Sequence, residues 1–439
     1  MKPVDCPRES KPRIRVALML LTAGTAASCA RSVPQAAAQT RFPVPSAVAP
    51  PVVRYSLCDE GLPRSGMWKC DPVFKDINGD GNLDLAATPR KGNGPRVWFG
   101  DGTGRWQAAS TGLQIDSSCG GGVALGDVNR DGFIDLALAD HCHGLFVFLG
   151  DGAGKWQVTT RGLYPEPLAR SANDADAFRG SEDLDLGDVN GDGALDIVAG
   201  ATDEGGVALF LGDGTGKNWK FSPSKSLPPQ GLANRVRFAD TNADGYLDIV
   251  AAYNRGPRVW HGDGHGNFTA ASDGLPEPIA TGLYRGIDVG DVNGDGIMDL
   301  VTANWVDGPE LYFQSRDGRW TKAPDVFPEM LGGAVGITLA DIDGDKDLDI
   351  VTSGRLTQNV GFVYGVFVLL GDGRGGFTPL KRSGLLDTGL AFTWGVAVGD
   401  VNKDSVLDIV AGSGGLVATV PGPEEPVIAT RLPVWCGSR

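Results

Sequence analysis

Histidine, cysteine and long apolar runs are scarce in this sequence. Four histidines and seven cysteines occur among 439 residues. So few histidines provide no His-centred acid–base or nucleophilic constellation, and no P-loop or dinucleotide-binding fingerprint is present. We therefore expect no catalytic residues and no enzyme. Lys and Arg number 39 against 54 Asp and Glu, a net charge of −15, so no basic stripe is available for nucleic acid.

The N-terminal residues have the composition of an export signal. Basic residues precede a short apolar core at Val16–Ala23, which is far below the roughly 20 residues that span a bilayer. The segment Ala26-Ala27-Ser28-Cys29 follows, and it resembles the lipobox of bacterial lipoproteins, although Ala26 stands where that pattern prefers Leu. We expect residues 1–28 to be a signal peptide and Cys29 to carry the lipid, with cleavage after Ala30 as the alternative.

Residues 29–51 are rich in Pro and Ala and lack a core pattern, which predicts a tether. The N-terminal segment as a whole predicts an exported lipoprotein of a bacterial outer membrane or cell surface. A secreted or periplasmic protein is the alternative. Contact with the membrane is expected only through the lipid anchor.

A nine-residue pattern dominates the rest of the chain. It occurs seven times, at intervals of 50 to 61 residues. The copies are DINGDGNLD from Asp76, DVNRDGFID from Asp127, DVNGDGALD from Asp188, DTNADGYLD from Asp240, DVNGDGIMD from Asp291, DIDGDKDLD from Asp341 and DVNKDSVLD from Asp400. A period near 50 residues indicates repeated supersecondary units.

Each copy lies between two strand-like segments. A third segment then ends in Gly-Asp-Gly-x-Gly, and a fourth opens with Trp or Phe, as in FGDGTGRW at 99–106. Asp-Gly between apolar runs favours a hairpin because glycine adopts the positive φ of the turn. Four antiparallel strands in each unit describe a propeller blade. The sequence therefore predicts an all-β, seven-bladed β-propeller over residues 52–439.

These repeats resemble the FG-GAP or VCBS repeat family, which includes the N-terminal propellers of integrin α subunits. The resemblance implies a calcium ion on the loop between the first two strands of each blade. Two segments could close the ring, residues 427–434 or Val52–Leu57, and the sequence leaves both open.

The residue types of the loops also suit calcium. Positions 1, 3, 5 and 9 carry Asp or Asn oxygens, and position 7 can add a backbone carbonyl, as in an EF-hand loop. His and Cys are absent from these positions, which argues against zinc and copper. The predicted ligands of up to seven Ca²⁺ are Asp76, Asn78, Asp80, Asn82, Asp84, Asp127, Asn129, Asp131, Phe133, Asp135, Asp188, Asn190, Asp192, Ala194, Asp196, Asp240, Asn242, Asp244, Tyr246, Asp248, Asp291, Asn293, Asp295, Ile297, Asp299, Asp341, Asp343, Asp345, Asp347, Asp349, Asp400, Asn402, Asp404, Val406 and Asp408.

Charge balance supports the same prediction. Residues 1–28 carry five basic and two acidic residues, so their removal takes the net charge from −15 to −18, and seven Ca²⁺ would bring it to −4. Without metal, the carboxylates within each loop repel one another. The alternative is that these Asp, Asn and Gly residues only form turns. Seven copies with Asp at position 9 favour the metal.

Export permits disulfides. Cys119 precedes the first strand of the second blade and Cys142 follows its second strand, so the two are candidates for a bridge. Cys58 could pair with Cys70 across a loop, or with Cys436 as a clasp on the ring. His141-Cys142-His143 lacks a further metal ligand in sequence and is more simply a loop with an oxidised cysteine.

Two further sets of residues lie outside the loops. Residues three positions before each loop should face the central channel, and among them Asp185, Arg237 and Asp288 form either an ion-paired cluster or a small charged-ligand site.

Variable aromatic and basic residues gather at the blade end opposite the loops, which is typical of a binding surface, or they pack within blades. The ligand-face candidates are Tyr253, Arg255, Tyr284, Arg285, Trp305 and Trp394.

The sequence thus predicts a calcium-stabilised module on the cell surface that binds or adheres to a protein or glycan partner. A polysaccharide-processing hydrolase or lyase on the same kind of propeller is the alternative. The fold alone does not distinguish these functions.

Overall fold

In the computed structural model, the chain divides into Met1–Ala49 and Pro50–Arg439. The structure describes residues 53–116, 118–164, 180–202, 205–227, 231–253, 256–276, 284–324, 327, 331–358, 361–385, 390, 392–414 and 431–439, all in the second part. The expected signal peptide, Cys29, the tether and Arg255 lie outside the described residues.

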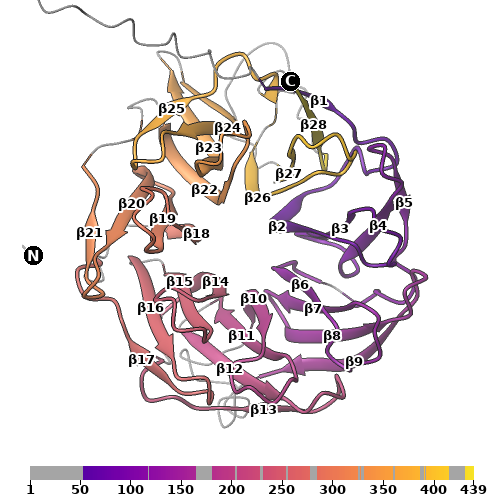
Figure 1. Ribbon diagram of the computed structural model, residues 1–439. Coiled ribbons are helices and arrows are strands. Elements are labelled where there is room, and N and C mark those ends of the chain that lie inside the picture. Colours follow the sequence, from indigo (N-terminus) through magenta and orange to yellow (C-terminus); the bar gives the residue numbers. More distant parts are fainter. Residues whose placement is uncertain are drawn as a thin grey trace, which may run out of the picture. The chain divides into compact units, whose positions relative to one another are not determined.

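Seven four-stranded antiparallel sheets are arranged around one centre (Figure 1), which confirms the predicted seven-bladed β-propeller. The first six blades are, in order, β2 (Trp68–Lys75), β3 (Asp84–Pro89), β4 (Arg96–Gly100), β5 (Trp106–Ala108); β6 (Val123–Gly126), β7 (Asp135–Asp140), β8 (Gly144–Gly150), β9 (Trp156–Leu163); β10 (Ser181–Gly187), β11 (Asp196–Ala201), β12 (Val207–Gly212), β13 (Trp219–Phe221); β14 (Ala233–Ala239), β15 (Asp248–Tyr253), β16 (Gly256–Gly262), β17 (Phe268–Ala270); β18 (Tyr284–Gly290), β19 (Asp299–Asn304), β20 (Gly308–Gln314), β21 (Trp320–Lys322); and β22 (Leu331–Ala340), β23 (Asp349–Gln358), β24 (Gly361–Gly371), β25 (Phe377–Pro379).

The seventh blade is assembled from both ends of the propeller. It contains β26 (Thr393–Gly399), β27 (Asp408–Ser413), β28 (Val434–Ser438) and, outermost, β1 (Arg54–Leu57). Tyr55 lies opposite Gly437 in the β1–β28 ladder. Of the two segments considered from the sequence, Val52–Leu57 therefore supplies the outermost strand. The strand beside it is Val434–Ser438, which shares only Val434 with the segment 427–434.

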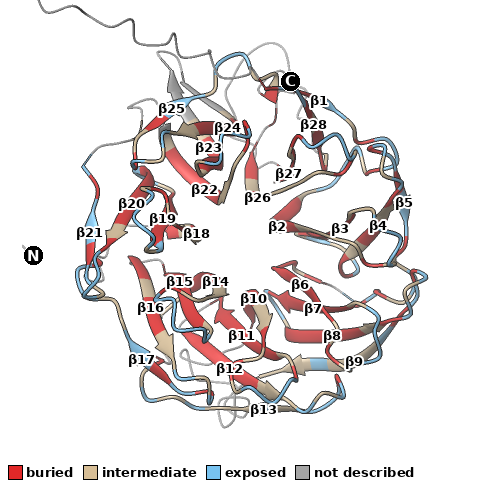
Figure 2. Cartoon of the chain, in the orientation of Figure 1, coloured by how far each residue is buried: buried red, intermediate tan, exposed pale blue. Residues whose placement is uncertain are grey.

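Apolar packing explains why the repeats assemble side by side. The second strand of most blades is buried at every position, because neighbouring blades cover both of its faces; Asp84–Pro89 and Asp299–Asn304 are examples (Figure 2). Seven buried apolar clusters occur, and each joins two consecutive blades. The cluster containing Leu85, Trp98, Val410 and Val434 joins the seventh blade to the first. The core is thus a set of interfaces, which suits a repeat architecture.

The Trp that opens the fourth strand adds a polar link between blades. Trp156 Nε1 donates to the carbonyl of Ala109 at 2.8 Å, and Trp320 Nε1 donates to that of Ala271 at 2.9 Å. Within the described part of the chain, no helix has the length and apolar character needed to cross a membrane.

Candidate functional site

All seven acidic loops lie between the first and second strands of a blade, and each is folded around its first aspartate. In the first loop, Asp76 Oδ1 accepts hydrogen bonds from the backbone N–H groups of Gly79 at 2.8 Å and Asp80 at 3.2 Å. Asp76 Oδ2 accepts from the N–H of Gly81 at 2.9 Å. The position 6 bond recurs in all seven loops. The first carboxylate is therefore fixed at the centre of its loop.

The aspartate at position 5 organises the second half of each loop. Asp80 Oδ1 accepts the N–H of Asn82 at 2.8 Å, and Asp80 Oδ2 accepts from the Asn78 amide at 3.1 Å. The bond from position 7 to position 5 is present in every copy. Side-chain oxygens of positions 1, 3 and 5 are thereby held within one small loop.

The aspartate at position 9 is buried and connects the loop to the third strand. Asp84 Oδ2 accepts the N–H of Ile77 at 2.8 Å, and its Oδ1 accepts the N–H of Gly100 at 2.9 Å. The other six copies make the equivalent pair of bonds. Burial raises the pKa of Asp84 to about 6 and that of Asp408 to about 7, although the hydrogen bonds from the backbone act to lower both pKa values. A nearby cation would favour the charged form of these carboxylates.

The sixth loop concentrates negative charge most strongly. Carboxylate oxygens of Asp341, Asp343 and Asp345 lie within 4.8 Å of one another. Burial raises the pKa of Asp343, and the neighbouring charge of Asp345 adds to this. Several carboxylate oxygens converging on one point form a donor set suited to a hard cation such as calcium, so the residues present fit the predicted ion. A bound calcium would neutralise this charge and join the two halves of the loop.

Position 6 of the loop requires a left-handed backbone. The φ angle there is 80° at Gly81 and 83° at Gly296, and it is 81° at Lys346 and 66° at Ser405, where glycine is missing. A side chain in this region costs about 1 kcal/mol or more. If the predicted calcium binds, the extra negative charge of Asp343 and Asp347 would attract it and partly offset this cost in the sixth loop, whereas the seventh loop has no extra carboxylate.

Replacing Ser405 with glycine is therefore expected to stabilise the protein by about 1 kcal/mol, because it removes the left-handed strain. In a calcium titration we expect five similar sites, an altered sixth site, and a seventh site that fills last and tightens in Ser405→Gly. The matched control is Ser405→Ala, which keeps the strained φ and should give no gain. Equal stabilisation by alanine and glycine would disprove this explanation.

Ion pairs close the centre of the ring. Asp71 in the first blade reaches Arg235 at 2.6 Å and Arg237 at 2.9 Å, both in the fourth blade. Asp183 in the third blade pairs with the same two arginines at 3.3 and 2.9 Å. Burial raises the pKa of Asp71, an effect that both arginines partly offset. We call these four residues the central plug.

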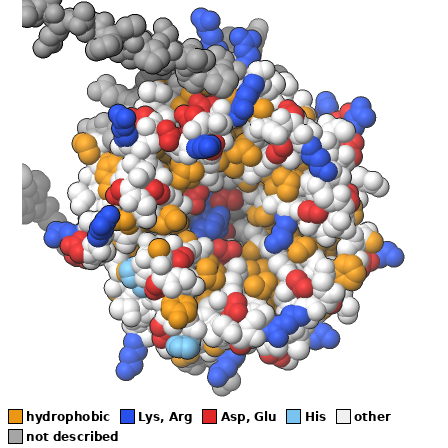
Figure 3. Space-filling model, viewed as in Figure 1, with side chains coloured by type: hydrophobic (Ala, Val, Ile, Leu, Met, Phe, Trp, Pro, Cys, Tyr) orange, Lys and Arg blue, Asp and Glu red, His pale blue; other side chains and the backbone are white. Residues whose placement is uncertain are grey.

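Only Arg237 and Asp288 of the three residues predicted for the channel line the central cavity. Asp185 accepts the backbone N–H of Phe238 at 2.9 Å, and the ion pairs of Arg237 are with Asp71 and Asp183. Arg237, Asp288, Thr338, Val73 and Ala397 line a central cavity of about 260 Å³ together with Asp71. Figure 3 shows basic and acidic side chains meeting in a hollow at the middle of the ring. Asp71, Asp183 and Arg235 were not predicted from the sequence, and they lie two positions further from the loops. Since alternate strand residues share a face, the same periodicity could have identified them.

Glycines make room for the plug. Four blades have glycine at the position that holds Asp71 in the first blade: Gly122, Gly286, Gly336 and Gly395. A Cβ atom at Gly122 would collide with the Asp183 carboxylate, and one at Gly395 would collide with Asp71. Gly122 and Gly395 therefore leave the space that the Asp183 and Asp71 carboxylates occupy.

An aromatic and basic cluster forms at the blade end opposite the acidic loops. Phe392 contacts Trp305, Tyr364 and Trp394, with ring centroids 5.2, 5.5 and 4.8 Å away. The guanidinium carbon of Arg355 lies 5.0 Å from the Trp305 ring, and that of Arg90 lies 5.7 Å from the Trp394 ring. We call these six residues the aromatic face. They come from the first, fifth, sixth and seventh blades.

Only part of the predicted ligand face belongs to this cluster. Trp305 and Trp394 do, whereas Tyr253 and Tyr284 are 7% and 4% exposed and pack in apolar clusters between blades. The Tyr284 hydroxyl donates to Glu310 at 3.1 Å. Arg285 is partly buried and donates to the Asn234 side chain. The two tyrosines were misassigned because a residue at a strand end can point between blades as readily as outward.

Two disulfides are present among the described residues. Cys119 and Cys142, considered together from the sequence, are bonded, with Cα atoms 5.6 Å apart. Cys58 is bonded to Cys436, with a Cα separation of 5.7 Å, and this replaces the Cys58–Cys70 pairing. The second bond lies beside the closing β1–β28 ladder because Cys58 directly follows β1 and Cys436 belongs to β28. This bond joins residues 378 positions apart at the seam, the place where the two ends of the propeller meet in the seventh blade.

The seven blades and their recurring acidic loops define a repeat propeller. The FG-GAP-like repeat model matches residues 76–138, 127–199, 188–251, 240–302 and 291–352. The chain therefore belongs to the FG-GAP-like repeat family.

Comparisons with individual proteins are consistent with this family and add little beyond the fold. Over 109 residues, the chain is 34% identical to cartilage acidic protein 1 of Mus musculus and 32% identical to that of Homo sapiens. This match covers 24% of the chain and only 17% and 16% of the two relatives. A crystal structure of BBS1N in complex with ARL6DN has a TM-score of 0.53 at 12% identity, with 88% of this chain and 96% of that one covered, which is a likeness of fold alone.

Proposed function

We propose that this protein is a calcium-stabilised binding or adhesion module of the cell surface, and that the aromatic face contacts its protein or glycan partner. Calcium belongs to the acidic loops at the other end of the blades, where it stabilises the scaffold. Export and a lipid anchor at Cys29 complete the proposal, and they follow from the N-terminal sequence.

The aromatic face is the observation that carries this proposal. Four aromatic side chains from three blades converge there, and each indole ring has an arginine beside it. Trp305, Tyr364 and Trp394 are partly exposed, whereas Phe392 is buried and supports their rings from below the surface. Aromatic and arginine side chains are typical anchors of binding surfaces.

Truncating either partly exposed tryptophan of the aromatic face should weaken partner binding strongly. The binding assay combines a glycan array with capture of native envelope proteins, and the wild-type protein identifies the partner. Loss of an anchoring aromatic residue costs about 2 kcal/mol, so Trp305→Ala and Trp394→Ala should each weaken binding about 30-fold. Thermal melts establish that both variants remain folded.

Two exposed aromatics on the acidic loops serve as matched controls. Phe133 and Tyr246 are 48% and 47% exposed, and Phe133→Ala and Tyr246→Ala should bind like the wild type. If these variants lost binding while the Trp305 and Trp394 variants kept it, the ligand would lie on the loop end and the proposal would be wrong.

A further inference from the structure

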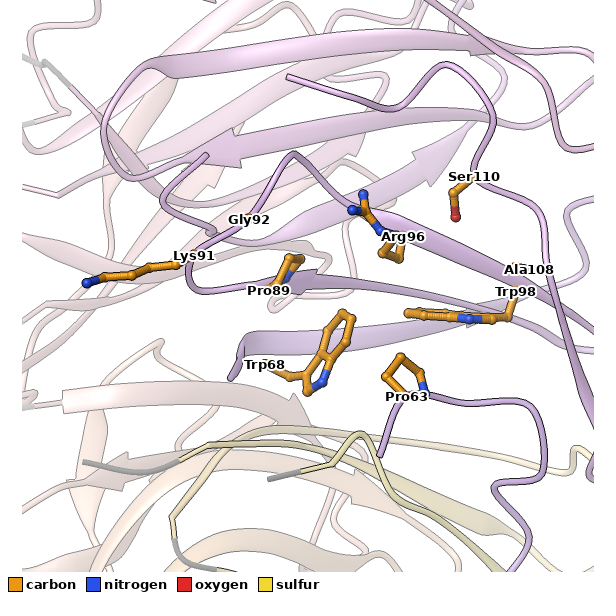
Figure 4. Close-up of a pocket in the computed structure, with 9 residues that line it drawn as sticks. All are labelled: Pro63, Trp68, Pro89, Lys91, Gly92, Arg96, Trp98, Ala108 and Ser110. Atoms are coloured by element: carbon orange, nitrogen blue, oxygen red, sulfur yellow. The ribbon is translucent and has the colours of Figure 1, made fainter. Parts of the chain in front are cut away.

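A separate cavity lies within the first blade, beside the aromatic face. It has a volume of about 450 Å³, which is within the usual range for small-molecule sites. Its lining residues are Pro63, Trp68, Pro89, Lys91, Gly92, Arg96, Trp98, Ala108 and Ser110 (Figure 4). They come from the segment before β2, from β2 to β5 and the turns between these strands, and, for Ser110, from the connection that follows β5. The cavity therefore needs no strand of another blade.

Rings and prolines form the walls of this cavity. The Trp68 and Trp98 rings meet edge to face, with centroids 5.5 Å apart and planes at 68°. Pro63 and Pro89 lie close to the two indoles in Figure 4. Trp68 is 5% exposed, and its Nε1 is buried without a hydrogen-bond partner in the described part of the chain. Flat and rigid walls of this kind suit a ligand with a ring.

The charged residues at the cavity are all basic. Arg96 Nη1 donates to the carbonyls of Asn93, Gly94 and Pro95 at 3.4, 3.2 and 3.0 Å. Burial lowers the pKa of Arg96, and among the described residues no carboxylate pairs with it. Lys91 lies exposed at the rim, and Figure 4 shows its side chain directed away from the rings. Because Lys91 is exposed, its side chain can change rotamer and place the ammonium group above a bound ligand at a small cost in free energy.

This local charge contrasts with the rest of the protein. The chain carries a net charge of −15, yet two cations and no acidic side chain line this cavity. Arg96 and Lys91 would both attract an anion, and a partly buried guanidinium interacts more strongly than an exposed one because water screens it less. The combination of aromatic walls and uncompensated cations defines the ligand class.

We propose that this cavity binds a small ring compound that carries a carboxylate, with the ring against Trp68 and Trp98 and the carboxylate toward Arg96 and Lys91. Two sources share this chemistry, namely an acidic sugar unit and an aromatic carboxylate. The proposal goes beyond the surface-binding function and does not depend on it, because the aromatic face is not part of the cavity.

The test uses calorimetry and tryptophan fluorescence of the calcium-loaded protein with three probes: galacturonate, galactose and benzoate. Galacturonate should bind about tenfold or more tightly than neutral galactose. The variant Lys91→Glu should weaken galacturonate binding about tenfold, since Lys91 is exposed and its replacement leaves the walls intact. The matched control is Lys155→Glu, which changes an exposed lysine of the second blade and should have no effect.

Each outcome decides between the possibilities. Tighter binding of benzoate than of galacturonate, lost again in Lys91→Glu, would support the site and identify aromatic carboxylates as its source. Equal binding of galactose and galacturonate, unchanged binding in Lys91→Glu, or no binding of either acid at about 10 mM would overturn the proposal. Arg96→Gln also removes bonds within its turn, so it is used only as a second variant, with a melt to check folding.

Discussion

Removing calcium with EDTA is expected to lower the melting temperature of this protein by about 15 °C. Extracellular calcium modules bind with dissociation constants of roughly 10⁻⁴ M at the tight end, so each site at about 2 mM calcium contributes about 1.8 kcal/mol. Seven sites give about 12 kcal/mol. The unfolding entropy of a propeller of this size is about 0.8 kcal/mol per kelvin, which converts that free energy into about 15 °C.

The crowding of carboxylates explains why the effect should be large. Three carboxylates of the sixth loop lie within 4.8 Å, and every loop buries an aspartate at position 9. Added Ca²⁺ should restore the melting temperature, and Mg²⁺ should restore it poorly, because it prefers to keep its water ligands. An unchanged melt after complete metal removal, verified by elemental analysis, would show that these loops are turns without a structural ion.

Opening the disulfide at the seam should destabilise the protein more than opening the other one. Chain-entropy reasoning gives about 6 kcal/mol for Cys58–Cys436, which spans 378 residues, and about 3 kcal/mol for Cys119–Cys142, which spans 23. The double variant Cys58→Ser/Cys436→Ser should therefore melt about 7 °C lower, and Cys119→Ser/Cys142→Ser about 4 °C lower.

The two double variants are matched, because each removes one disulfide and leaves the other in place. Thiol titration of the unfolded proteins establishes that the remaining bond is formed. Equal losses, or a larger loss in the Cys119 variant, would mean that the apolar cluster of Leu85, Trp98, Val410 and Val434 holds the seam without help from the disulfide.

The sequence predicted the blades because each repeat encodes its strands locally. The pattern from Asp76 to Asp84 is sufficient to place a turn and a following strand, and seven copies specify the architecture. Left-handed φ at Ser405 also follows from its position in the repeat, although serine itself disfavours it.

Contacts that depend on the closed ring could not be obtained in the same way. Asp71 and Arg237 are 166 residues apart and meet only because seven blades bring the first and fourth innermost strands together. The aromatic face needs residues from four blades, and a single repeat does not specify how these residues meet. Trp305 and Trp394 each stand one repeat position later than the buried Tyr253 and Tyr284, since Trp305 lies 14 residues after Asp291 and Tyr253 lies 13 after Asp240. Because successive residues of a strand point to opposite faces, this offset separates the two pairs.

The central plug changes how such a ring can come apart. A ring of blades is expected to open where its first and last blades meet, because that contact is not continuous along the chain. Here the ion pairs of Asp71 with Arg235 and Arg237 connect the first blade to the fourth across the centre of the ring. These ion pairs join the first and fourth blades without passing through the seventh, so we expect the first blade to stay in position when the outer edge of the seventh is released.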